Sequence, residues 1–348
     1  MNEASLFVPL PGGSVRCTAC RRYCTLKTGQ TGFCGVRKNI DGKLYLLVYG
    51  KPLAIQVDPI EKKPVLHMYP GYRIYSIGTA GCDFACQFCQ NYDISQRRQD
   101  VGIPMTSKDI ASDAVARECD GIAFTYNEPT IFSEFAGEIG MLAREKGMIN
   151  IFVSNGYETS ESIRYISNFL DCITVDFKGN ASVEFYRRYI SVPDSDVIFD
   201  SLEEMKKAKM HVEVTDLVIP EIGDDQNEAR RMVKKVRDIF GDDMPISFLR
   251  FHPDYRLINL PPTPYEILIS HYRIAREEEM KYVYIGNVPG SKYQNTYCPE
   301  CGSLCVERDM LRTVSLKITG DGKCLSCGFQ LNIILGERGK FSRSVSAK

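Results

Sequence analysis

The sequence predicts an α/β fold: a partial barrel of the (β/α)6 type with small cysteine-rich, metal-binding segments at both ends. Two observations predict it. Apolar, β-branched runs alternate with segments of helical spacing from about residue 70 to residue 290, and nine of the 14 cysteines gather near the two ends of the chain. Alternating strands and helices indicate βαβ units and a parallel sheet, and the crossovers of such units are right-handed.

Seven runs are predicted to be strands because each is rich in β-branched and aromatic residues. They span residues 73–81, 121–128, 149–156, 172–179, 211–220, 246–253 and 282–289. Helical spacing falls between them at 107–118, 130–147, 224–241 and 264–279. The strand runs are apolar on both faces, which suits a sheet that helices cover.

The composition changes at both ends of this alternation. Residues 1–50 are rich in Cys, Gly and basic residues and have little apolar periodicity, so we expect a metal-stapled N-terminal module there. The partial barrel is expected over 70–290 and a zinc-ribbon-like module over 291–335. A flexible tail is expected over 336–348, because this segment ends in the polar, basic sequence FSRSVSAK.

The overall charge and hydropathy exclude some classes of protein. The 348 residues have a formal net charge of −1, which gives no support for binding nucleic acid or an acidic membrane through overall charge. No run approaches the ~20 apolar residues of a membrane-spanning helix, and the first residues do not resemble a secretory signal. We therefore expect a cytoplasmic protein, whose cysteines favour metal or cluster ligation over disulfides.

The central cysteines Cys82, Cys86 and Cys89 form a C-x3-C-x2-C set directly after the first barrel strand. Three thiolates on one loop reach three corners of a [4Fe–4S] cluster and leave one iron open, whereas most electron-transfer clusters use four thiolates. The alternative is a zinc knuckle with a distant fourth ligand. The place at the carboxyl end of a barrel strand, where such folds hold their active sites, favours the cluster.

The other cysteines divide into two end groups and two single residues. Near the C-terminus two C-x2-C knuckles, Cys298 with Cys301 and Cys324 with Cys327, predict a four-thiolate zinc site and leave Cys305 spare. Near the N-terminus the spacing is C-x2-C-x3-C-x9-C, formed by Cys17, Cys20, Cys24 and Cys34. These four predict either zinc, which the short basic loop favours, or a second iron–sulfur cluster. Cys119 and Cys172 stand apart and are expected to be plain buried thiols.

The cluster loop resembles that of the radical S-adenosylmethionine (SAM) superfamily, and later strand ends carry similar segments. YNEPT (126–130) lies where that family has a Gly-Gly-Glu-Pro segment, with Tyr126 and Asn127 in place of the glycines. SNG (154–156) and DFK (176–178) resemble strand ends of the pyruvate formate-lyase-activating enzyme branch. The chain is similar over nearly its whole length to radical SAM proteins of the AmmeMemoRadiSam system, which share GFCGVR (32–37), VIPEIGDD (218–225), FHPDYRL (251–257), YIGNVPG (284–290) and CPECG (298–302).

The resemblance implies a SAM site at these strand ends and assigns no catalytic residue beyond the cluster and that site. The SAM-binding residues it implies are Glu128, Asn127, Asp176 and Lys178, and the positions of Asn155 and His252 at strand ends add these two as candidates. Polar groups at the ends of apolar strands are costly unless they are paired or used. Structural alternatives stay open: Glu128 and Lys178 as a rim ion pair, His252 satisfying a loop carbonyl, and Asn155 as a turn residue.

The resemblance also implies the reaction. SAM is cleaved reductively at the cluster to a 5′-deoxyadenosyl radical that abstracts hydrogen from a substrate, with electrons from a reductant such as ferredoxin or flavodoxin. The leading hypothesis is a protein substrate, as for glycyl-radical activases, because metal modules at both ends suit docking to a macromolecule. The alternatives are modification of a small molecule or RNA, and a non-catalytic, metal-stapled binding scaffold, which the neutral charge and the three-cysteine loop count against.

Overall fold

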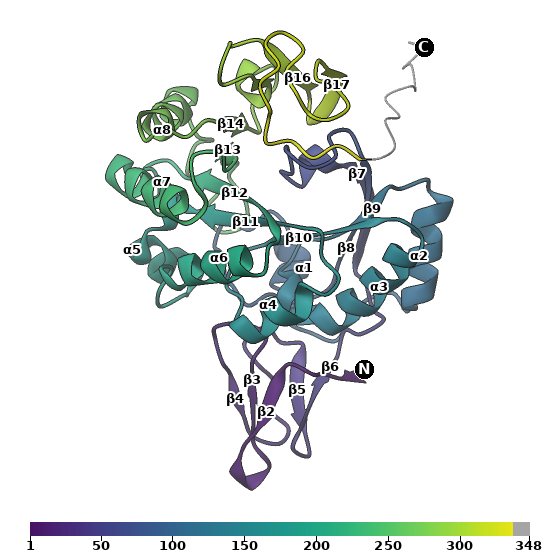
Figure 1. Cartoon of the computed structure of the whole chain (residues 1–348). Helices are drawn as coiled ribbons and strands as arrows, with labels where there is room; N and C mark the ends of the chain where they lie inside the picture. The colour runs from purple at the N-terminus through teal and green to yellow at the C-terminus, as the bar shows by residue number, and fades with distance from the viewer. Residues whose placement is uncertain (337–348) are drawn as a thin grey trace.

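The computed structural model describes residues 1–336, so nearly all of the predicted tail, 336–348, lies outside the described residues. Its centre is an open eight-stranded sheet in the order β14-β13-β12-β11-β10-β9-β8-β7 (Figure 1). Seven strands run parallel and β7, at one edge, pairs antiparallel with β8. The strands are β7 (Ala54–Pro59), β8 (Arg73–Gly78), β9 (Gly121–Phe124), β10 (Ile149–Ser154), β11 (Cys172–Lys178), β12 (His211–Val218), β13 (Ile246–Arg250) and β14 (Val283–Gly286).

This sheet confirms the predicted α/β fold, and all seven predicted strands are present within the predicted ranges. The helices that lie between consecutive strands and cover the sheet are α2 (Ser107–Ala116), α3 (Ser133–Glu145), α4 (Ser160–Ile166), α6 (Val197–Lys207), α7 (Gln226–Phe240) and α8 (Tyr265–Glu277). Shorter helical segments lie in the connections between strands: η2 (Ile60–Lys62), α1 (Tyr92–Ser95), η3 (Pro129–Phe132), η4 (Gly179–Ala181), α5 (Val183–Phe185) and the π-helix η5 (Tyr186–Ile190).

The main core lies between the sheet and these helices. Phe124 and Phe152, on neighbouring strands, stack edge to face with ring centroids 5.5 Å apart, and Phe169 packs on both. Residues that alternate with them along the strands point away from the helices, which leaves polar side chains such as Thr174 and Thr215 for the inside of the partial barrel. One face of the sheet therefore packs against the helices, and the other presents polar side chains to the inside of the partial barrel.

The N-terminal module consists of two small antiparallel sheets. They are formed by β1 (Asn2–Glu3), β2 (Phe7–Pro9), β3 (Val15–Cys17), β4 (Thr25–Leu26), β5 (Arg37–Ile40) and β6 (Lys43–Leu46), with η1 (Pro11–Gly13) between β2 and β3. Figure 1 shows this module projecting from one end of the barrel. It docks on the loops that follow β8, β9 and β10, for example through the Arg21 amide to the Tyr157 carbonyl (2.9 Å), so it lies at the carboxyl end of the sheet.

The C-terminal module lies at the opposite end (Figure 1). Its antiparallel sheet, β15 (Thr296–Tyr297), β16 (Leu304–Asp309) and β17 (Arg312–Leu316), follows η6 (Lys292–Gln294). The module holds the segment that connects β7 to β8, because Arg308 donates to the Leu66 carbonyl (2.7 Å) and the Ile334 amide donates to the His67 carbonyl (2.7 Å). The backbone amides of residues 66 and 67 in turn donate to Glu213 inside the barrel, both at 2.8 Å. The C-terminal module thus closes the amino-end floor of the barrel.

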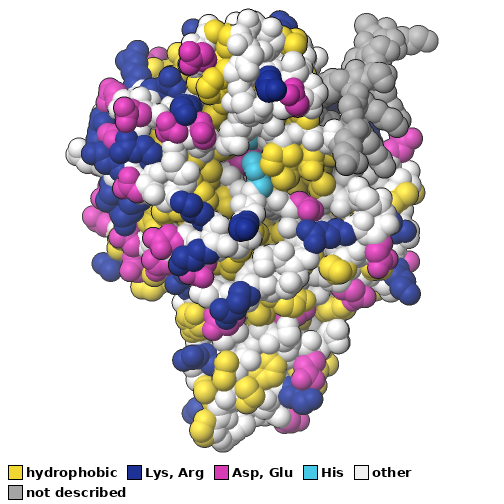
Figure 2. All heavy atoms as spheres, viewed as in Figure 1, with side chains coloured by type: hydrophobic (Ala, Val, Ile, Leu, Met, Phe, Trp, Pro, Cys, Tyr) yellow, Lys and Arg dark blue, Asp and Glu magenta, His cyan; other side chains and the backbone are white. Residues whose placement is uncertain are grey.

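Charged side chains of both signs intermingle over the helices on the left of Figure 2, in keeping with the near-zero net charge. Helix α7 contributes several ion pairs there, among them Arg231 with Asp196 at 2.7 Å. Within residues 1–336, none of the helices has the length and the apolar character needed to cross a membrane.

Candidate active site

The loop after β8, which carries Cys82, Cys86 and Cys89, is held from two sides. On one side the Asn127 side chain accepts from the Thr79 amide (3.0 Å) and donates to the Gly81 carbonyl (2.8 Å). On the other side the amides of residues 85 and 87 each donate to carbonyls of η5 at 3.0 Å. Gly81 has φ +90°, and a Cβ there would lie 2.4 Å from the Cys34 carbonyl oxygen, so only glycine fits.

The three sulfurs of this loop lie in surroundings that suit thiolate ligands. Cys82 and Cys86 are buried, and Cys89 is half-buried. The Phe84 amide donates to the Cys82 sulfur (3.4 Å), and the Cys89 sulfur is hydrogen-bonded to the Ser95 hydroxyl (3.0 Å). Burial raises the pKa of each thiol, and these hydrogen bonds oppose that rise at Cys82 and Cys89. A free thiol in this place stays protonated, whereas a metal deprotonates it and such donors then stabilise the thiolate.

Three carboxyl groups meet beside this loop: Asp83, Glu128 and Glu158. Glu128 accepts from the Asn155 amide (2.8 Å) and the Ser154 hydroxyl (3.0 Å), while the Asn155 side chain donates to Asp83 (2.8 Å). All three carboxyl groups are buried, and burial is the main cause that raises the pKa of each. Mutual repulsion adds to it at Glu128, so this network holds protons unless a cation compensates its charge.

Two oxygens of the network, Asp83 Oδ2 and Glu158 Oε2, are buried without a hydrogen-bond partner among the described residues. Such orphaned acceptors are costly and require a partner. They lie at the carboxyl ends of β8 and β10, which is where parallel sheets bind their ligands. A ligand with donors or positive charge fits there.

Lys178 ends β11 on the same rim. Its amine donates to the Asp176 carboxylate (2.9 Å) and carbonyl (2.8 Å), and Thr215 also donates to Asp176 (2.9 Å). Burial lowers the pKa of Lys178, but the electrostatic interactions with Asp176 and Cys86 raise it by a larger amount. The pKa is therefore raised overall, and the amine stays charged. The interaction with Cys86 places a cation beside the cluster loop.

Backbone strain marks the turn that follows Lys178. Gly179, Asn180 and Ala181 are all left-handed, with φ of 56°, 60° and 56°, a conformation that Ala adopts only at a cost. The Asn180 amide donates to the buried Asp216 (2.9 Å), and burial raises the pKa of that carboxyl to about 7. This turn fixes the direction in which β11 presents Lys178.

The structure does not bring all six predicted SAM-site residues together. The structure brings Glu128, Asn155, Asp176 and Lys178 to the carboxyl ends of β9, β10 and β11. The Asn127 side chain lies there too, but its amide is occupied with the cluster loop. His252 is not part of the buried group, because its side chain is 68% exposed and bonds Asp254 (3.0 Å). The rim ion pair of Lys178 is with Asp176 and not with Glu128.

Asp83 and Glu158 are residues that the sequence reasoning missed. Asp83 stands between two ligand cysteines, and Glu158 follows SNG after one further residue. The available signal was a carboxylate near the end of an apolar strand, the same signal that pointed to Glu128.

The C-terminal cysteines Cys298, Cys301, Cys324 and Cys327 converge as predicted, with ligand atoms within 4.8 Å of one another. The Cys298–Cys327 and Cys301–Cys324 sulfurs are 3.6 and 3.7 Å apart. Four sulfurs at 2.3 Å from a tetrahedral ion are about 3.8 Å apart. The geometry fits one metal ion, as expected for a metal-binding module.

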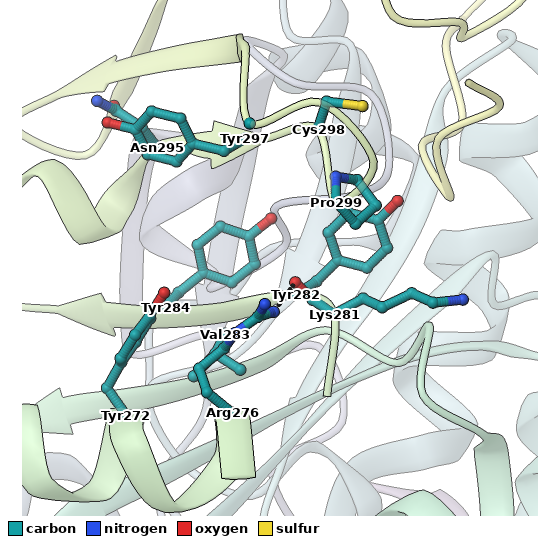
Figure 3. A pocket seen from close by; sticks show the side chains of 11 residues that line it. Tyr272, Arg276, Lys281, Tyr282, Val283, Tyr284, Asn295, Tyr297, Cys298 and Pro299 are labelled. Atoms are coloured by element: carbon teal, nitrogen blue, oxygen red, sulfur yellow. Dashed lines mark hydrogen bonds between the residues drawn. The ribbon is translucent and has the colours of Figure 1, made fainter. Parts of the chain in front are cut away.

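A pocket of about 330 Å³ lies between β14 and this module, lined by aromatic side chains including Tyr282 and Tyr284 (Figure 3). Tyr282 immediately precedes Val283, the first residue of β14, and Lys281 comes one residue earlier. The pocket therefore opens at the amino end of the sheet, away from Cys82 and Glu128, and does not belong to the candidate active site.

Comparison with known proteins agrees with this location. The radical SAM superfamily pattern matches residues 76–236, a stretch that contains the cluster loop and the carboxyl network. An uncharacterized protein of Methanocaldococcus jannaschii is 40% identical over 339 residues, which cover 96% of this chain and 100% of that protein. Solved structures are more distant. A domain of pyruvate-formate lyase-activating enzyme from Bacteroides vulgatus is 14% identical with a TM-score of 0.42, covering 48% of this chain and 99% of that one. A radical SAM methyltransferase from Sphaerobacter thermophilus is 12% identical with a TM-score of 0.49, covering 62% and 67%.

Proposed function

Because the chain belongs to the radical SAM superfamily, whose members use a [4Fe–4S] cluster and SAM, we propose that it cleaves SAM reductively and passes the radical to a protein substrate. The observation that carries the proposal is the loop of Cys82, Cys86 and Cys89 at the carboxyl end of β8, where the Phe84 amide and the Ser95 hydroxyl are hydrogen-bonded to two of its sulfurs. We assign these three thiolates as ligands of the cluster.

Cys82, Cys86 and Cys89 would hold the cluster, which when bound would supply the electron for reductive cleavage of the SAM C5′–S bond to methionine and the 5′-deoxyadenosyl group that abstracts hydrogen from the substrate. The chain's own residues bind and orient. Asn127 and the carbonyls of η5 hold the ligand loop rigid, and Phe84 and Phe88, both buried, exclude water from the sulfurs.

The carboxyl network is proposed to bind the cationic part of SAM. SAM carries an ammonium and a sulfonium against one carboxylate, whereas the network of Asp83, Glu128 and Glu158 holds three buried carboxyl groups and has Arg22 as a neighbouring cation, which favours the charged form of Asp83. A bound cation lowers the pKa values that burial raises, and an ammonium donates to the orphaned oxygens of Asp83 and Glu158. Lys178, charged and beside Cys86, is proposed to attract the SAM carboxylate from the other side.

For partners, we propose a low-potential one-electron donor of the ferredoxin or flavodoxin type and a protein substrate. Of the seven Lys and Arg in residues 1–50, Arg37 is buried and six are exposed or half-buried, against two Asp and Glu, and this module lies beside the cluster loop. A basic surface there suits an acidic electron carrier. We also propose membership of the AmmeMemoRadiSam group, on the motifs shared along the chain, and zinc at Cys298, Cys301, Cys324 and Cys327.

The test is anaerobic purification, reduction with dithionite, addition of SAM and detection of 5′-deoxyadenosine and methionine. Wild type is expected to form both, and Cys86→Ala is expected to form neither. Cys305→Ser is the matched control, because Cys305 is buried in the C-terminal module and far in sequence from the loop. Product formation by Cys86→Ala refutes the ligand assignment, and its absence from wild type leaves the scaffold hypothesis.

Substrate class is tested separately. Addition of a lysate of the native organism is expected to raise the yield of 5′-deoxyadenosine, and protease treatment of the lysate is expected to abolish that rise. A rise that survives protease but not nuclease or small-molecule removal favours RNA or a small molecule instead.

A further inference from the structure

Tyr126 stands immediately before Asn127 and Glu128, and its backbone conformation is unusual. Its φ is +71°, in the left-handed region, where a bulky side chain is a genuine outlier. Such strain persists only where the surroundings fix the residue, and it gathers at functional sites. Two sets of contacts fix Tyr126 in the structure, one on its backbone and one on its side chain.

The backbone of Tyr126 lies against the cluster loop. Its carbonyl accepts from the side chain of Asn91, two residues after Cys89 (3.0 Å). Gly78, the last residue of β8, permits this close approach, because a Cβ there would lie 2.6 Å from the Thr125 carbonyl oxygen and 3.1 Å from Tyr126 Cβ. A shift of the Tyr126 backbone would therefore move the cluster loop as well.

The side chain of Tyr126 reaches the edge of the sheet. Tyr126 follows β9, whereas its phenol donates to Asp58 on β7 (2.9 Å), and β8 lies between these two strands (Figure 1). This hydrogen bond ties the segment after β9 to a strand that is two positions away in the sheet.

Asp58 is a charged acceptor that other groups hold in place. Lys63 donates to its Oδ2 (2.7 Å), and Lys62 donates to its Oδ1 (2.8 Å). The Asp58 and Lys63 side chains are 7% and 3% exposed, so this ion pair is buried. Burial raises the pKa of Asp58, but the hydrogen bonds from Lys62 and Lys63 lower it by more, and the pKa lies well below its usual range. The phenol therefore donates to a carboxylate, and such a bond is stronger than a neutral one.

Lys63 connects this ion pair to the interior of the barrel. Its ammonium lies 4.8 Å from the centroid of the Tyr126 ring, within the range of a cation–π contact. Its carbonyl accepts from the buried Thr174 hydroxyl on β11 (2.9 Å). Through Asp58 and Lys63, Tyr126 is therefore held by strands on both sides of β9.

We propose that Tyr126, fixed by Asp58 and Lys63, is a positioning residue that holds Asn127 in place for the cluster loop and Glu128 in place for SAM. The inference rests on the proposed function, because SAM is the ligand that Glu128 is proposed to bind. Loss of the phenol should loosen this segment without removing any proposed ligand of the cluster or of SAM.

The variant Tyr126→Phe tests the inference, because it removes the hydroxyl and keeps the ring. After anaerobic reconstitution, its iron content and the EPR signal of its reduced cluster without SAM should match those of wild type. Its Kd for SAM, measured by anaerobic calorimetry, should rise about tenfold, since a hydrogen bond to a charged group is lost. Tyr75→Phe is the matched control with an unchanged Kd, because the Tyr75 phenol donates to Asp113 on the helix-facing side of β8 (2.6 Å).

Hydrogen exchange in the absence of SAM gives a second readout. The amides of residues 126–130 should exchange faster in Tyr126→Phe than in wild type or Tyr75→Phe. Addition of Asp58→Asn to Tyr126→Phe should increase that exchange less than Asp58→Asn does alone, because the two side chains act through one hydrogen bond. Tyr126→Gly relieves the backbone strain but removes the anchor, so it should also weaken SAM binding.

The outcomes separate this inference from the proposed function. Equal Kd values in wild type and Tyr126→Phe, or an equal rise in Tyr75→Phe, would overturn the positioning role and leave the proposed function intact. SAM binding by Tyr126→Gly as tight as that of wild type would overturn it as well. Absence of SAM binding by wild type with a full cluster would refute the proposed function, and the positioning role with it.

Discussion

Replacement of Arg37 by Met should release the N-terminal module from the barrel. The guanidinium is 1% exposed and joins three partners: the Glu134 carboxylate, the Ile131 carbonyl and the Cys17 sulfur. Met keeps much of the volume but leaves Glu134, itself 8% exposed, with the amides of Ser5 and Leu6 as its remaining partners. Removing one member of a buried ion pair costs about 3–5 kcal/mol. Because residues 1–50 contact the barrel through this pair, the cost should fall on the docking of the module.

Native-state hydrogen exchange measured by mass spectrometry reports such local opening. Protection over residues 1–50 and the start of α3 should fall by about 3 kcal/mol, which is more than a hundredfold. The variant Arg37→Met/Glu134→Leu replaces both charges and should recover at least half of that loss, because an apolar pair can substitute for a buried ion pair. A change below about fivefold in Arg37→Met, or strictly additive losses in the double variant, would refute the reasoning.

Three further predictions follow from other sites. Glu128→Gln should weaken SAM binding by about 10- to 100-fold in anaerobic calorimetry, since a charged hydrogen bond is lost, and an unchanged Kd contradicts the proposed SAM site. Cys301→Ser should lose the zinc that Cys305→Ser retains, and equal zinc in both variants, measured by mass spectrometry, contradicts the metal site. Burial lowers the pKa of His67 to about 4, below its unfolded value of about 6.5. The unfolded state therefore binds more protons between these values, and stability is present above pH 6.5 and lost on acidification. Exchange protection of residues 60–70 should fall by about 2 kcal/mol from pH 7 to pH 5. His67→Gln should flatten that slope, and an equal slope in both proteins argues against His67.

Much of the fold was predictable because buried parallel strands are apolar on both faces and therefore stand out in the sequence. β7 was missed because an edge strand is half-exposed, and its sequence, AIQVDP, mixes apolar with polar residues. α4 and α6 were also missed. α4 has only seven residues, whereas α6 places Ile198, Phe199, Leu202 and Met205 at helical spacing, a signal that was present and overlooked. The π-helix η5 has no sequence signal, since its geometry depends on the loop it holds.

The candidate site was predictable where local spacing decides it. The C-x2-C knuckles and the cluster loop are local, and so they could be recognised without knowing the fold. The contact of Asp83 with Asn155, and of Asn155 with Glu128, depends on which strands are neighbours in the sheet. The prediction that Asn127 binds SAM rested on the resemblance of YNEPT to the Gly-Gly-Glu-Pro segment, and the side chain's partners in the cluster loop became visible only in three dimensions.

Spacing along the chain does not by itself say which thiols bind metal, whereas their convergence in the fold does. Cys305 lies within the C-terminal group in sequence, yet the four sulfurs that lie within 4.8 Å of one another are those of Cys298, Cys301, Cys324 and Cys327. The Cys305 thiol instead donates to the Ser303 carbonyl (3.5 Å), and Cys119 likewise donates to the Arg117 carbonyl (3.8 Å). The fold therefore separates the C-terminal ligand cysteines from the spare one before any metal binds.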